Sequence, residues 1–401
     1  MLGNDRTLWI MNLLLRKLNT LKDICIRCIA FIIPKNKSLI VYGGSWDLFI
    51  DNAKHQFLLN NETMVEYRHV WLTKRKDTLD YMQRHGLQSV KSDSLMGLWL
   101  LLRAAFIIYD DGINYFANQN LSVGAHRINI WHGVPAKMIG RCRKEEDCVA
   151  CKKVSRWHEL KFPTYGEYLV CTSKSLMTIF SYSMQIPINK ILISGYPRTH
   201  VFFMGRSELW RYVTRYESDN FQEIYKYISN LKCRKYIYMP TFRDKNKNYL
   251  TLAVPDWGRL NKACQEANTV LFVKVHRVTP LPDVSQYSNI LIMDNQMDVY
   301  PLLPLFDMLI TDYSSIMFDF SLMAKKILLY IFDIEQYRTQ SRPIFSYFDE
   351  LLEDISHVDS FDDFVKAMSV NFDDIHQFPS NVFFDSPKDF EQIPNLIRKL
   401  S

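Results

Sequence analysis

Short apolar runs alternate with helical stretches along most of the chain. The apolar runs are rich in β-branched and aromatic residues, which is typical of strands. In the first half they lie at residues 38–44, 69–73, 105–111, 127–131, 167–173 and 190–197. The segments between them carry helical periodicity, as in residues 95–105. Strands that alternate with helices predict βαβ units and a mostly parallel sheet.

The same alternation restarts after a polar stretch, residues 208–231, that predicts helix and no strand. In the second half the strand-like runs lie at residues 235–242, 269–276, 289–294, 307–315 and 326–333, and the chain after Val358 reads as helical. We therefore expect an α/β protein with two Rossmann-like domains that face a cleft, one over residues 35–205 and the other over residues 206–401.

Residues 1–34 predict a separate amphipathic helix. Arg16, Lys17, Lys22 and Arg27 interrupt its apolar positions, so no run of about 20 apolar residues exists to span a bilayer. Such a helix lies either in a membrane interface or against its own domain, and the sequence leaves both possibilities open. The apolar positions at helical spacing are Trp9, Leu13, Leu14, Leu18, Leu21, Ile24, Cys25 and Cys28.

The composition is that of an ordinary soluble protein. Hydrophobic residues make up 48% of the 401 residues and charged residues 23%, which excludes long disorder and collagen-like repeats. The formal net charge of +6 permits an anionic partner, such as a phosphate-rich substrate or a membrane surface, without requiring nucleic acid. Eight cysteines are too few for a disulfide scaffold, and no cleavable signal peptide is visible. We therefore expect reduced thiols and a cytoplasmic protein.

Several polar residues directly follow the predicted strands, where ligands bind in open α/β sheets. His132 follows the strand at 127–131 and is suited to general base chemistry near neutral pH. Gly133 allows a close backbone approach, and Lys137 could face a phosphate. A hydrogen-bonded structural histidine in a tight turn is the alternative.

A second group of polar residues lies before a predicted helix at 316–326. Hydroxyls and backbone N–H groups at a helix start bind anions, whereas simple N-capping would explain the same residues. The residues are Thr311, Asp312, Ser314 and Ser315.

Cationic residues follow three other strands. His276 ends the strand at 269–276, and Arg277 follows it. Arg243 follows the strand at 235–242, and Arg198 follows the strand at 190–197, the last of the first half. Guanidinium groups bind phosphate through two parallel hydrogen bonds, so these positions fit an anionic ligand. Surface loops with internal ion pairs are the alternative.

Other motifs are weak or absent. Cys142, Cys148, Cys151 and His158 could hold a structural zinc ion, but their spacing does not match known finger types, so free thiols are the favoured interpretation. The chain has no HExxH, no GxSxG and no glycine-rich dinucleotide motif, which weakens metalloprotease, esterase and NAD-enzyme interpretations. No nucleic-acid-binding motif is present either.

The strand-end motifs together resemble a known family, the CDP-glycerol glycerophosphotransferases of teichoic acid and capsule synthesis. WHGVPAK resembles the family's WHGTPLK, GYPRTH its GYPRND, MPTFRD its APTWRD, KVHR its KLHP, and LITDYSSIMFDF its LITDYSSVMFDF. Asp333 and Tyr337 follow as they do in the family. Each motif alone is weak, but five in the right order over residues 38–337 are specific.

The resemblance implies a GT-B fold and a peripheral protein at the cytoplasmic face of the membrane. It implies transfer of glycerol phosphate or ribitol phosphate from a CDP-alcohol to a lipid-linked saccharide or polyol-phosphate acceptor, with release of CMP and no required cofactor. His132 and His276 would be catalytic. Gly133, Lys137 and Arg198 would lie on the acceptor side. The donor and its phosphates would bind to Arg243, Arg277, Thr311, Asp312, Ser314, Ser315 and Asp319.

Some positions depart from the family pattern. His200 stands where the family has an acidic residue, Arg277 replaces a proline, and the family's elements beyond Tyr337 are not recognisable. These departures leave the donor alcohol and the acceptor open. Two rival functions also remain: a GT-B glycosyltransferase that uses a nucleotide sugar, and an inactive membrane-bound scaffold of capsule assembly.

Overall fold

The computed structural model describes residues 18–112, 116–143, 166–243, 246–341, 343–369, 374–376, 378–379 and 382–401. These residues form two compact units. The first comprises residues 18–131, 166–170 and 393–401, and the second comprises residues 132–143 and 171–392 with the gaps given above. The units divide the chain differently from the domain boundaries that the sequence predicts, which stay a prediction.

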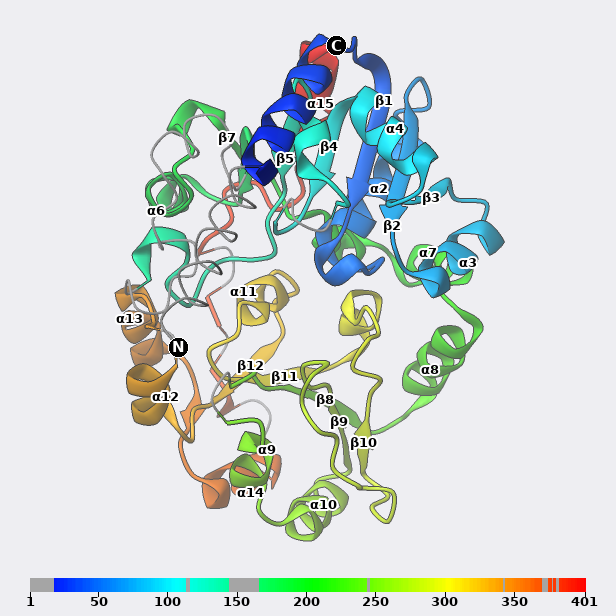
Figure 1. Cartoon of the computed structure of the whole chain (residues 1–401). Coiled ribbons are helices and arrows are strands. Elements are labelled where there is room, and N and C mark those ends of the chain that lie inside the picture. The colour runs from blue at the N-terminus through cyan, green and yellow to red at the C-terminus, as the bar shows by residue number, and fades with distance from the viewer. Residues whose placement is uncertain are drawn as a thin grey trace, which may run out of the picture. The chain divides into compact units, whose positions relative to one another are not determined.

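The first sheet contains seven strands within the described residues, in the order β3-β2-β1-β4-β5-β6-β7 (Figure 1). Neighbouring strands pair in parallel from β3 through β6. The strands are β1 (Asn36–Gly43), β2 (Arg68–Thr73), β3 (Ser89–Lys91), β4 (Ala104–Tyr109), β5 (His126–Asn129), β6 (Tyr168–Cys171) and β7 (Ile191–Ile193). Central strands β1 and β4 are almost wholly buried at their carboxyl halves, as the continuous apolar runs of their sequence predict.

Helices cover this sheet and begin where local sequence allows. In α4, for example, the Ser94 hydroxyl accepts from the backbone N–H of Gly97, which caps the helix after a polar turn. The helices of the first unit are α2 (Asp51–Thr63), α3 (Lys76–Arg84) and α4 (Leu95–Arg103). The last helix, α15 (Gln392–Leu400), returns to this unit and buries Ile393 and Ile397, as the apolar positions near the C-terminus predict.

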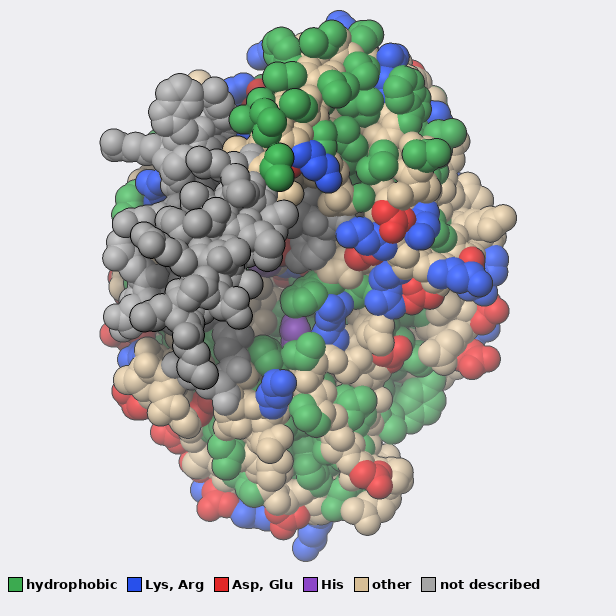
Figure 2. Space-filling view, viewed as in Figure 1, with side chains coloured by type: hydrophobic (Ala, Val, Ile, Leu, Met, Phe, Trp, Pro, Cys, Tyr) green, Lys and Arg blue, Asp and Glu red, His purple; other side chains and the backbone are tan. Residues whose placement is uncertain are grey.

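Residues 18–32 form a helix that turns apolar side chains outward. Its contacts with the short 3₁₀ helix η3 (Gln119–Ser122) are polar: Arg27 Nε donates to Asn120 Oδ1 at 2.7 Å, and Asn120 Nδ2 donates to Asp23 Oδ1 at 2.8 Å. Figure 2 shows hydrophobic side chains gathered over this helix and over α4. Within the described part of the chain, no helix is long and apolar enough to cross a membrane.

The second sheet contains six strands within the described residues, in the order β10-β9-β8-β11-β12-β13. All neighbouring pairs are parallel. The strands are β8 (Arg234–Met239), β9 (Thr269–Val273), β10 (Ile290–Ile292), β11 (Met308–Thr311), β12 (Lys326–Tyr330) and β13 (His357–Val358). Two parallel sheets with helical connections give the α/β architecture that the sequence predicts.

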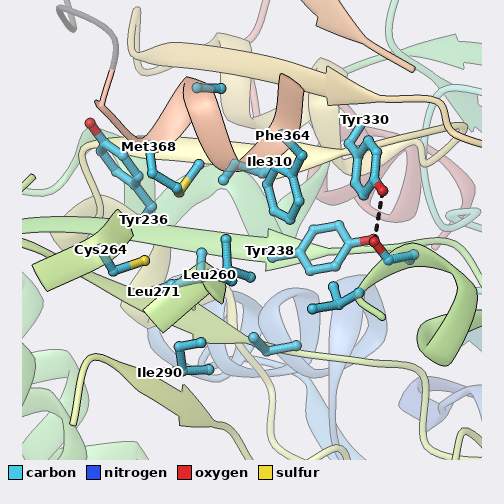
Figure 3. Packing of buried hydrophobic residues seen from close by; sticks show 14 of the residues in the cluster. Tyr236, Tyr238, Leu260, Cys264, Leu271, Ile290, Ile310, Tyr330, Phe364 and Met368 are labelled. Atoms are coloured by element: carbon cyan, nitrogen blue, oxygen red, sulfur yellow. Dashed lines mark hydrogen bonds between the residues drawn. The ribbon is translucent and has the colours of Figure 1, made fainter. Parts of the chain in front are cut away.

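Two helices of the second unit, α10 (Trp257–Glu266) and α14 (Phe361–Ser369), pack against each other on one face of the second sheet. Figure 3 shows this core, in which Tyr238, Tyr330 and Phe364 pack closely. Tyr330 and Phe364 stack at 4.4 Å between ring centroids, and the buried Tyr330 hydroxyl donates to Ala253 O at 2.7 Å. The helices are α6 (Lys174–Met184), α7 (Arg206–Tyr216), α8 (Asp219–Asn230), α9 (Tyr249–Ala253), α10 (Trp257–Glu266), α11 (Ile316–Ser321), α12 (Ile334–Gln340), α13 (Ser346–Asp354) and α14 (Phe361–Ser369).

The polar stretch at 208–231 is two helices rather than one. α7 ends at Tyr216, and α8 begins after Ser218, whose hydroxyl accepts from the backbone N–H of Phe221. This serine cap explains the break, because it supplies a helix start inside the polar stretch.

Register in the second sheet brings two strand ends together. Thr311 pairs with Met239, so the residues that follow β8 and β11 leave the sheet side by side. The Thr311 hydroxyl donates to Met239 O at 2.6 Å and strengthens this junction. The strand ends that the sequence marks as candidate sites are therefore adjacent in this unit.

Candidate functional site

Gly133 lies where three segments that are far apart in the sequence meet. Its φ is +133°, a conformation that side chains rarely adopt. A Cβ at this position would lie 2.8 Å from Ser315 Oγ and 2.9 Å from Arg198 Nη2. Arg198 belongs to the 3₁₀ helix η7 (Pro197–Phe203), and Ser315 immediately precedes α11. Only glycine fits here, and three of the motifs predicted from separate strand ends therefore converge.

Arg198 is held in place by a buried carboxylate. Its Nε and Nη2 atoms lie 3.0 Å and 2.6 Å from Asp319 Oδ2, and both side chains are at most 4% exposed. Asp319 belongs to α11, which begins just after Ser315. The pair therefore links the GYPR segment to the helix that follows the DYSS segment.

Tyr300 completes this cluster, and the sequence analysis missed it. Its hydroxyl donates to Asp319 Oδ2 at 2.7 Å, and the Arg198 guanidinium carbon lies 4.6 Å from its ring centroid. Tyr300 lies in the 3₁₀ helix η8 (Tyr300–Leu305), outside the strand ends at which the sequence predicts site residues. A buried tyrosine hydroxyl needs a hydrogen-bond partner, but the residues next to Tyr300 in the sequence do not indicate that this partner is Asp319.

Arg243 forms a second buried cluster at the ends of β8 and β11. Its Nε and Nη2 atoms donate to the two oxygens of Asp333 at 2.8 Å and 2.7 Å, and Nη2 also lies 2.9 Å from Asp312 Oδ2. Its Nη1 donates to Thr241 O at 2.6 Å. Burial opposes the charge, but the two carboxylates outweigh burial and raise the pKa of Arg243 above its usual value. Most of its donors are therefore used inside the protein, in buried ion pairs and hydrogen bonds rather than in the surface loop of the alternative interpretation.

Aromatic rings enclose the same guanidinium. Its central carbon lies between 4.8 Å and 5.6 Å from the ring centroids of Tyr249, Tyr313, Phe332 and Tyr337. These contacts favour a fixed cation over a mobile one, because each ring face attracts positive charge. Tyr313 also donates to Asp333 Oδ1 at 3.1 Å, so the rings and the carboxylates form one assembly.

Asp312 does not cap the helix that follows it. Its two oxygens accept from the backbone N–H of Thr241 at 2.9 Å and 3.1 Å, and its side chain is fully buried. Asp312 therefore ties the turn after β8 to the turn after β11. Thr311, fully buried, uses its hydroxyl in the sheet junction described above.

Ser314 and Ser315 are half-buried and lie between these two clusters along the chain. Ser315 occupies the N-cap position of α11, but its side chain makes no capping hydrogen bond. The capping interpretation of this hydroxyl is therefore wrong, and the Ser315 hydroxyl instead faces Gly133.

The remaining predicted residues lie on turns of the same unit. His276 is half-buried, with its ring 5.1 Å from the ring of Phe242, the neighbour of Arg243. Arg277 follows it, and its carbonyl accepts from Asn295 Nδ2 at 3.0 Å. Lys274 Nζ donates to Asn295 O at 2.9 Å, so Asn295 connects both ends of this turn.

The segment after Gly133 is fixed by backbone pairing. Lys137 forms an isolated antiparallel bridge with Ile344, flanked by hydrogen bonds from Met138 N to Pro343 O and from Phe345 N to Ala136 O. His132 directly precedes Gly133 and is half-buried. The segment that follows His132 is therefore held by the contacts of Gly133 at its start and by the bridge of Lys137 at its end.

The predicted zinc ligands are only partly described. The Sγ atom of Cys142 lies 3.0 Å from Ser183 Oγ. Cys148, Cys151 and His158 lie outside the described residues. In the part of the chain that the structure covers, no group of three or more His, Cys, Asp and Glu side chains is placed to hold a metal ion.

Comparison with known proteins identifies relatives over most of the chain. The family described as CDP-glycerol:poly(glycerophosphate) glycerophosphotransferase matches residues 26–376. The teichoic acid poly(glycerol phosphate) polymerase of Bacillus spizizenii is 23% identical over 340 residues, which cover 80% of each chain. The teichoic acid glycerol-phosphate primase of Bacillus subtilis is 29% identical over 251 residues, 59% of this chain and 60% of the primase. A poly(ribitol-phosphate) polymerase of B. spizizenii is 25% identical over 333 residues, 80% of this chain and 51% of that one.

Solved structures show the same fold. The wall teichoic acid polymerase TagF superimposes with a TM-score of 0.70 at 22% identity, covering 97% of this chain and 95% of that chain. The UDP-GlcNAc 2-epimerase of Methanocaldococcus jannaschii follows with a TM-score of 0.56 at 11% identity, covering 92% and 100%. At these identities the likeness concerns the fold alone, and it supports a GT-B-like architecture.

Proposed function

Because the chain belongs to the CDP-glycerol:poly(glycerophosphate) glycerophosphotransferase family, we propose that it transfers glycerol phosphate or ribitol phosphate from a CDP-alcohol to a hydroxyl of a lipid-linked saccharide or polyol-phosphate acceptor. CMP is the leaving group. The observation that carries this proposal is the convergence of Gly133, Arg198 and Ser315, one residue from each of three family motifs, on a single point. Relatives named for both glycerol phosphate and ribitol phosphate leave the polyol open.

In the proposed reaction His132 accepts the proton of the acceptor hydroxyl. The hydroxyl oxygen forms a bond to the β-phosphorus of the CDP-alcohol, and the bond from that phosphorus to the CMP oxygen breaks. His132 suits this role because it directly precedes Gly133, whose backbone lies against Ser315. No covalent intermediate is needed in this scheme.

Charge on the diphosphate is proposed to be met by His276, Arg277 and the hydroxyls of Ser314 and Ser315. Fixed donors aimed at developing charge stabilise a phosphoryl-transfer transition state most effectively. The Asn295 contacts support this role, because they hold the turn that carries His276 and Arg277. Lys137 is proposed to meet the acceptor.

Arg243, Thr311, Asp312 and Asp319 are proposed to act by position rather than by direct contact with the donor. Their polar groups make the internal hydrogen bonds and ion pairs described above. The contacts of Arg243, Thr311 and Asp312 fix the turns after β8 and β11, and the second of these turns carries Ser314 and Ser315. Arg198 belongs to the same group, because Asp319 holds its guanidinium.

We further propose that the helix of residues 18–32 lies in the interface of an anionic membrane, at the cytoplasmic face. Its polar side chains attach it to η3, so its apolar side chains are left for another partner. On α4, Leu95, Met96 and Trp99 are also exposed, and Arg103 lies 5.7 Å from the Trp99 ring. Apolar side chains beside cations are typical of interfacial helices. Six apolar residues of the helix are 49–78% exposed: Leu18, Leu21, Ile24, Ile29, Phe31 and Ile32.

Nucleotide release tests the reaction. The purified chain is incubated with CDP-glycerol, CDP-ribitol or a UDP-sugar, together with a lipid-linked disaccharide acceptor. We expect CMP release from a CDP-alcohol, reduced by about 100-fold or more in His132→Ala and His276→Ala. His357→Ala, at an exposed histidine on β13, is the matched control and should retain the wild-type rate. Release of UDP alone would support the glycosyltransferase alternative, and silence with every donor would support the scaffold.

A further inference from the structure

The two sheets share the same strand order around their central strands (Figure 1). The first sheet runs β3-β2-β1-β4-β5-β6 before β7, and the second runs β10-β9-β8-β11-β12-β13, so β1 corresponds to β8 and β4 to β11. In each sheet the chain continues from these two central strands toward opposite edges. Their carboxyl ends therefore form a topological switch point, which is where open α/β sheets bind ligands.

The same buried contact closes both switch points. Asp110 directly follows β4, is fully buried, and accepts from the backbone N–H of Ser45, the second residue after β1, at 2.8 Å. Asp312 directly follows β11, is fully buried, and accepts from the backbone N–H of Thr241, the second residue after β8, at 2.9 Å and 3.1 Å. The switch point of the first unit is therefore built like the one that carries the candidate site in the second unit.

The residues that follow on the two turns differ in their chemistry. In the second unit they are Phe242 and the buried Arg243, and in the first unit they are Trp46 and Asp47. Trp46 is 50% exposed. Asp47 is half-buried, and its Oδ2 accepts from the backbone N–H of Lys74 at 2.8 Å. The first unit thus presents an aromatic ring and a carboxylate where the second unit holds a guanidinium.

The turn after β1 holds Trp46 in a fixed position. It forms the 3₁₀ helix η1 (Ser45–Asp47), in which φ is +59° at Trp46 and +62° at Asp47, a left-handed conformation that residues with a side chain rarely adopt. On one side of the ring, Ser45 Oγ donates to Asp110 Oδ1 at 2.8 Å. On the other side, Thr73 Oγ1 donates to Asp47 O at 3.2 Å. A ring held in this way loses little conformational freedom when it binds a ligand.

We propose that this turn is a saccharide-binding subsite for the acceptor, in which the Trp46 ring stacks on a sugar ring and Asp47 accepts hydrogen bonds from sugar hydroxyls. The C–H bonds on the face of a sugar ring are weakly positive, and the face of an aromatic ring is negative, so the two attract. Hydrogen bonds to an ionised carboxylate are strong ones. The inference rests on the proposed function, which supplies a lipid-linked saccharide as the acceptor.

Calorimetric titration of the full chain with a water-soluble disaccharide diphosphate, N,N′-diacetylchitobiosyl hexyl diphosphate, tests the subsite. Trp46→Ala should bind this probe at least about tenfold more weakly than wild type, and Trp46→Phe, which keeps a ring, should recover most of the affinity. Trp46→Asn is a second way to remove the ring, because asparagine tolerates the left-handed backbone. Tyr227→Ala, which removes a ring on α8 that is also 50% exposed, is the matched control and should bind like wild type.

Hexyl diphosphate, which lacks the sugar, shows which part of the probe the ring contacts. The affinity for hexyl diphosphate should be the same in wild type and in Trp46→Ala. An equal loss for both probes, unchanged binding of the disaccharide probe in Trp46→Ala and Trp46→Asn, or no binding of it by wild type would overturn the proposal.

Turnover separates this subsite from the proposed reaction. In CMP release, Trp46→Ala should raise the KM for the disaccharide acceptor by about tenfold and leave the KM for the CDP-alcohol unchanged. If wild type released no CMP but lost saccharide binding on removal of the ring, the reaction would be wrong and the subsite would stand. If CMP release were normal and both KM values were unchanged in Trp46→Ala, the reaction would stand and the subsite would be wrong.

Discussion

Gly133 and Ser315 are in such close contact that a Cβ on residue 133 would lie 2.8 Å from the Ser315 hydroxyl oxygen. The two residues are far apart in the sequence, and each directly adjoins a group that we place in the reaction. The backbone after His132 thus lies against the turn that carries the proposed phosphate-binding hydroxyls. This contact sets the distance between the proposed base and those hydroxyls.

Gly133→Ala should abolish most activity while the protein stays folded. The added Cβ would displace Ser315 or Arg198, and the φ of +133° would cost about 1–3 kcal/mol of stability in a residue with a side chain. We expect CMP release to fall by about 100-fold or more, because a displacement of about 1 Å at a reacting group has that effect. Gly205→Ala is the matched control, since its Cβ would meet no atom within 4 Å. Activity in Gly133→Ala equal to that of Gly205→Ala would contradict the arrangement.

The ion pair of Arg198 and Asp319 should matter more for stability than any exposed pair. Asp319→Asn leaves a buried guanidinium without its counter-charge, which costs about 3–5 kcal/mol of unfolding free energy. Tyr300→Phe removes one hydrogen bond to the same carboxylate and should cost about 1.5–3 kcal/mol. Chemical denaturation measures both effects.

A double variant separates the pair from its parts. Arg198→Met/Asp319→Leu removes both charges and should be more stable than Asp319→Asn, because no buried charge is left unpaired. Its activity should nevertheless stay low, since the guanidinium beside Gly133 is gone. If the loss of stability in the double variant equalled the sum of the losses in Arg198→Met and Asp319→Leu, the two residues would be energetically independent.

Much of the fold could be predicted because central parallel strands are buried on both faces and read as unbroken apolar runs. β3 and β13 were missed since they are short edge strands of three and two residues, only partly buried, with no such run. The family and the class of enzyme, predicted from five motifs in order, are confirmed by the match over residues 26–376.

The individual site residues could be marked from the sequence, but not their contacts. The positions after each strand pointed to Arg198 and Ser315, because the carboxyl ends of parallel strands lie at one edge of a sheet, whereas Asp319 was marked only by the family resemblance. That Asp319 pairs with Arg198 depends on packing between segments 121 residues apart, and Tyr300, which joins them, lies 19 residues from Asp319 in a different element. No local pattern encodes such a distance, and the same holds for the two carboxylates on Arg243.

Asp110 at the end of β4 should make stability depend on pH. Its Oδ1 accepts from the N–H and the hydroxyl of Ser45, each at 2.8 Å, and its Oδ2 accepts from Ala53 N at 3.3 Å. Burial, and then the charge of Asp51, raises the pKa of Asp110 to about 8, although the Ser45 donors oppose this. The folded protein therefore holds a proton that the unfolded chain releases near pH 4.

Stability attributable to Asp110 is thus present below about pH 4 and is lost as pH rises toward about 8. Asp110→Asn removes this dependence. The unfolding free energy of wild type relative to Asp110→Asn should fall by more than about 1 kcal/mol between pH 4 and pH 8, the energy of one pKa unit. Denaturant titrations at several pH values measure it, with Asp354→Asn on the exposed end of α13 as the control. A difference that stays constant with pH would show that Asp110 is ionised throughout.

The exposed apolar face of residues 18–32 predicts binding to anionic vesicles. Phe31 and Ile32 are 75% and 78% exposed, and burying each in a bilayer interface would contribute about 1.5–3 kcal/mol. Phe31→Ser/Ile32→Ser should therefore weaken co-sedimentation with phosphatidylglycerol vesicles by tenfold or more, without loss of folding. Val65→Ser changes a residue of the same unit that is 82% exposed but lies outside this helix, and it should bind like wild type. If Phe31→Ser/Ile32→Ser bound vesicles as well as Val65→Ser does, the helix would pack on a protein surface instead. Vesicles would then not change the turnover of a water-soluble acceptor.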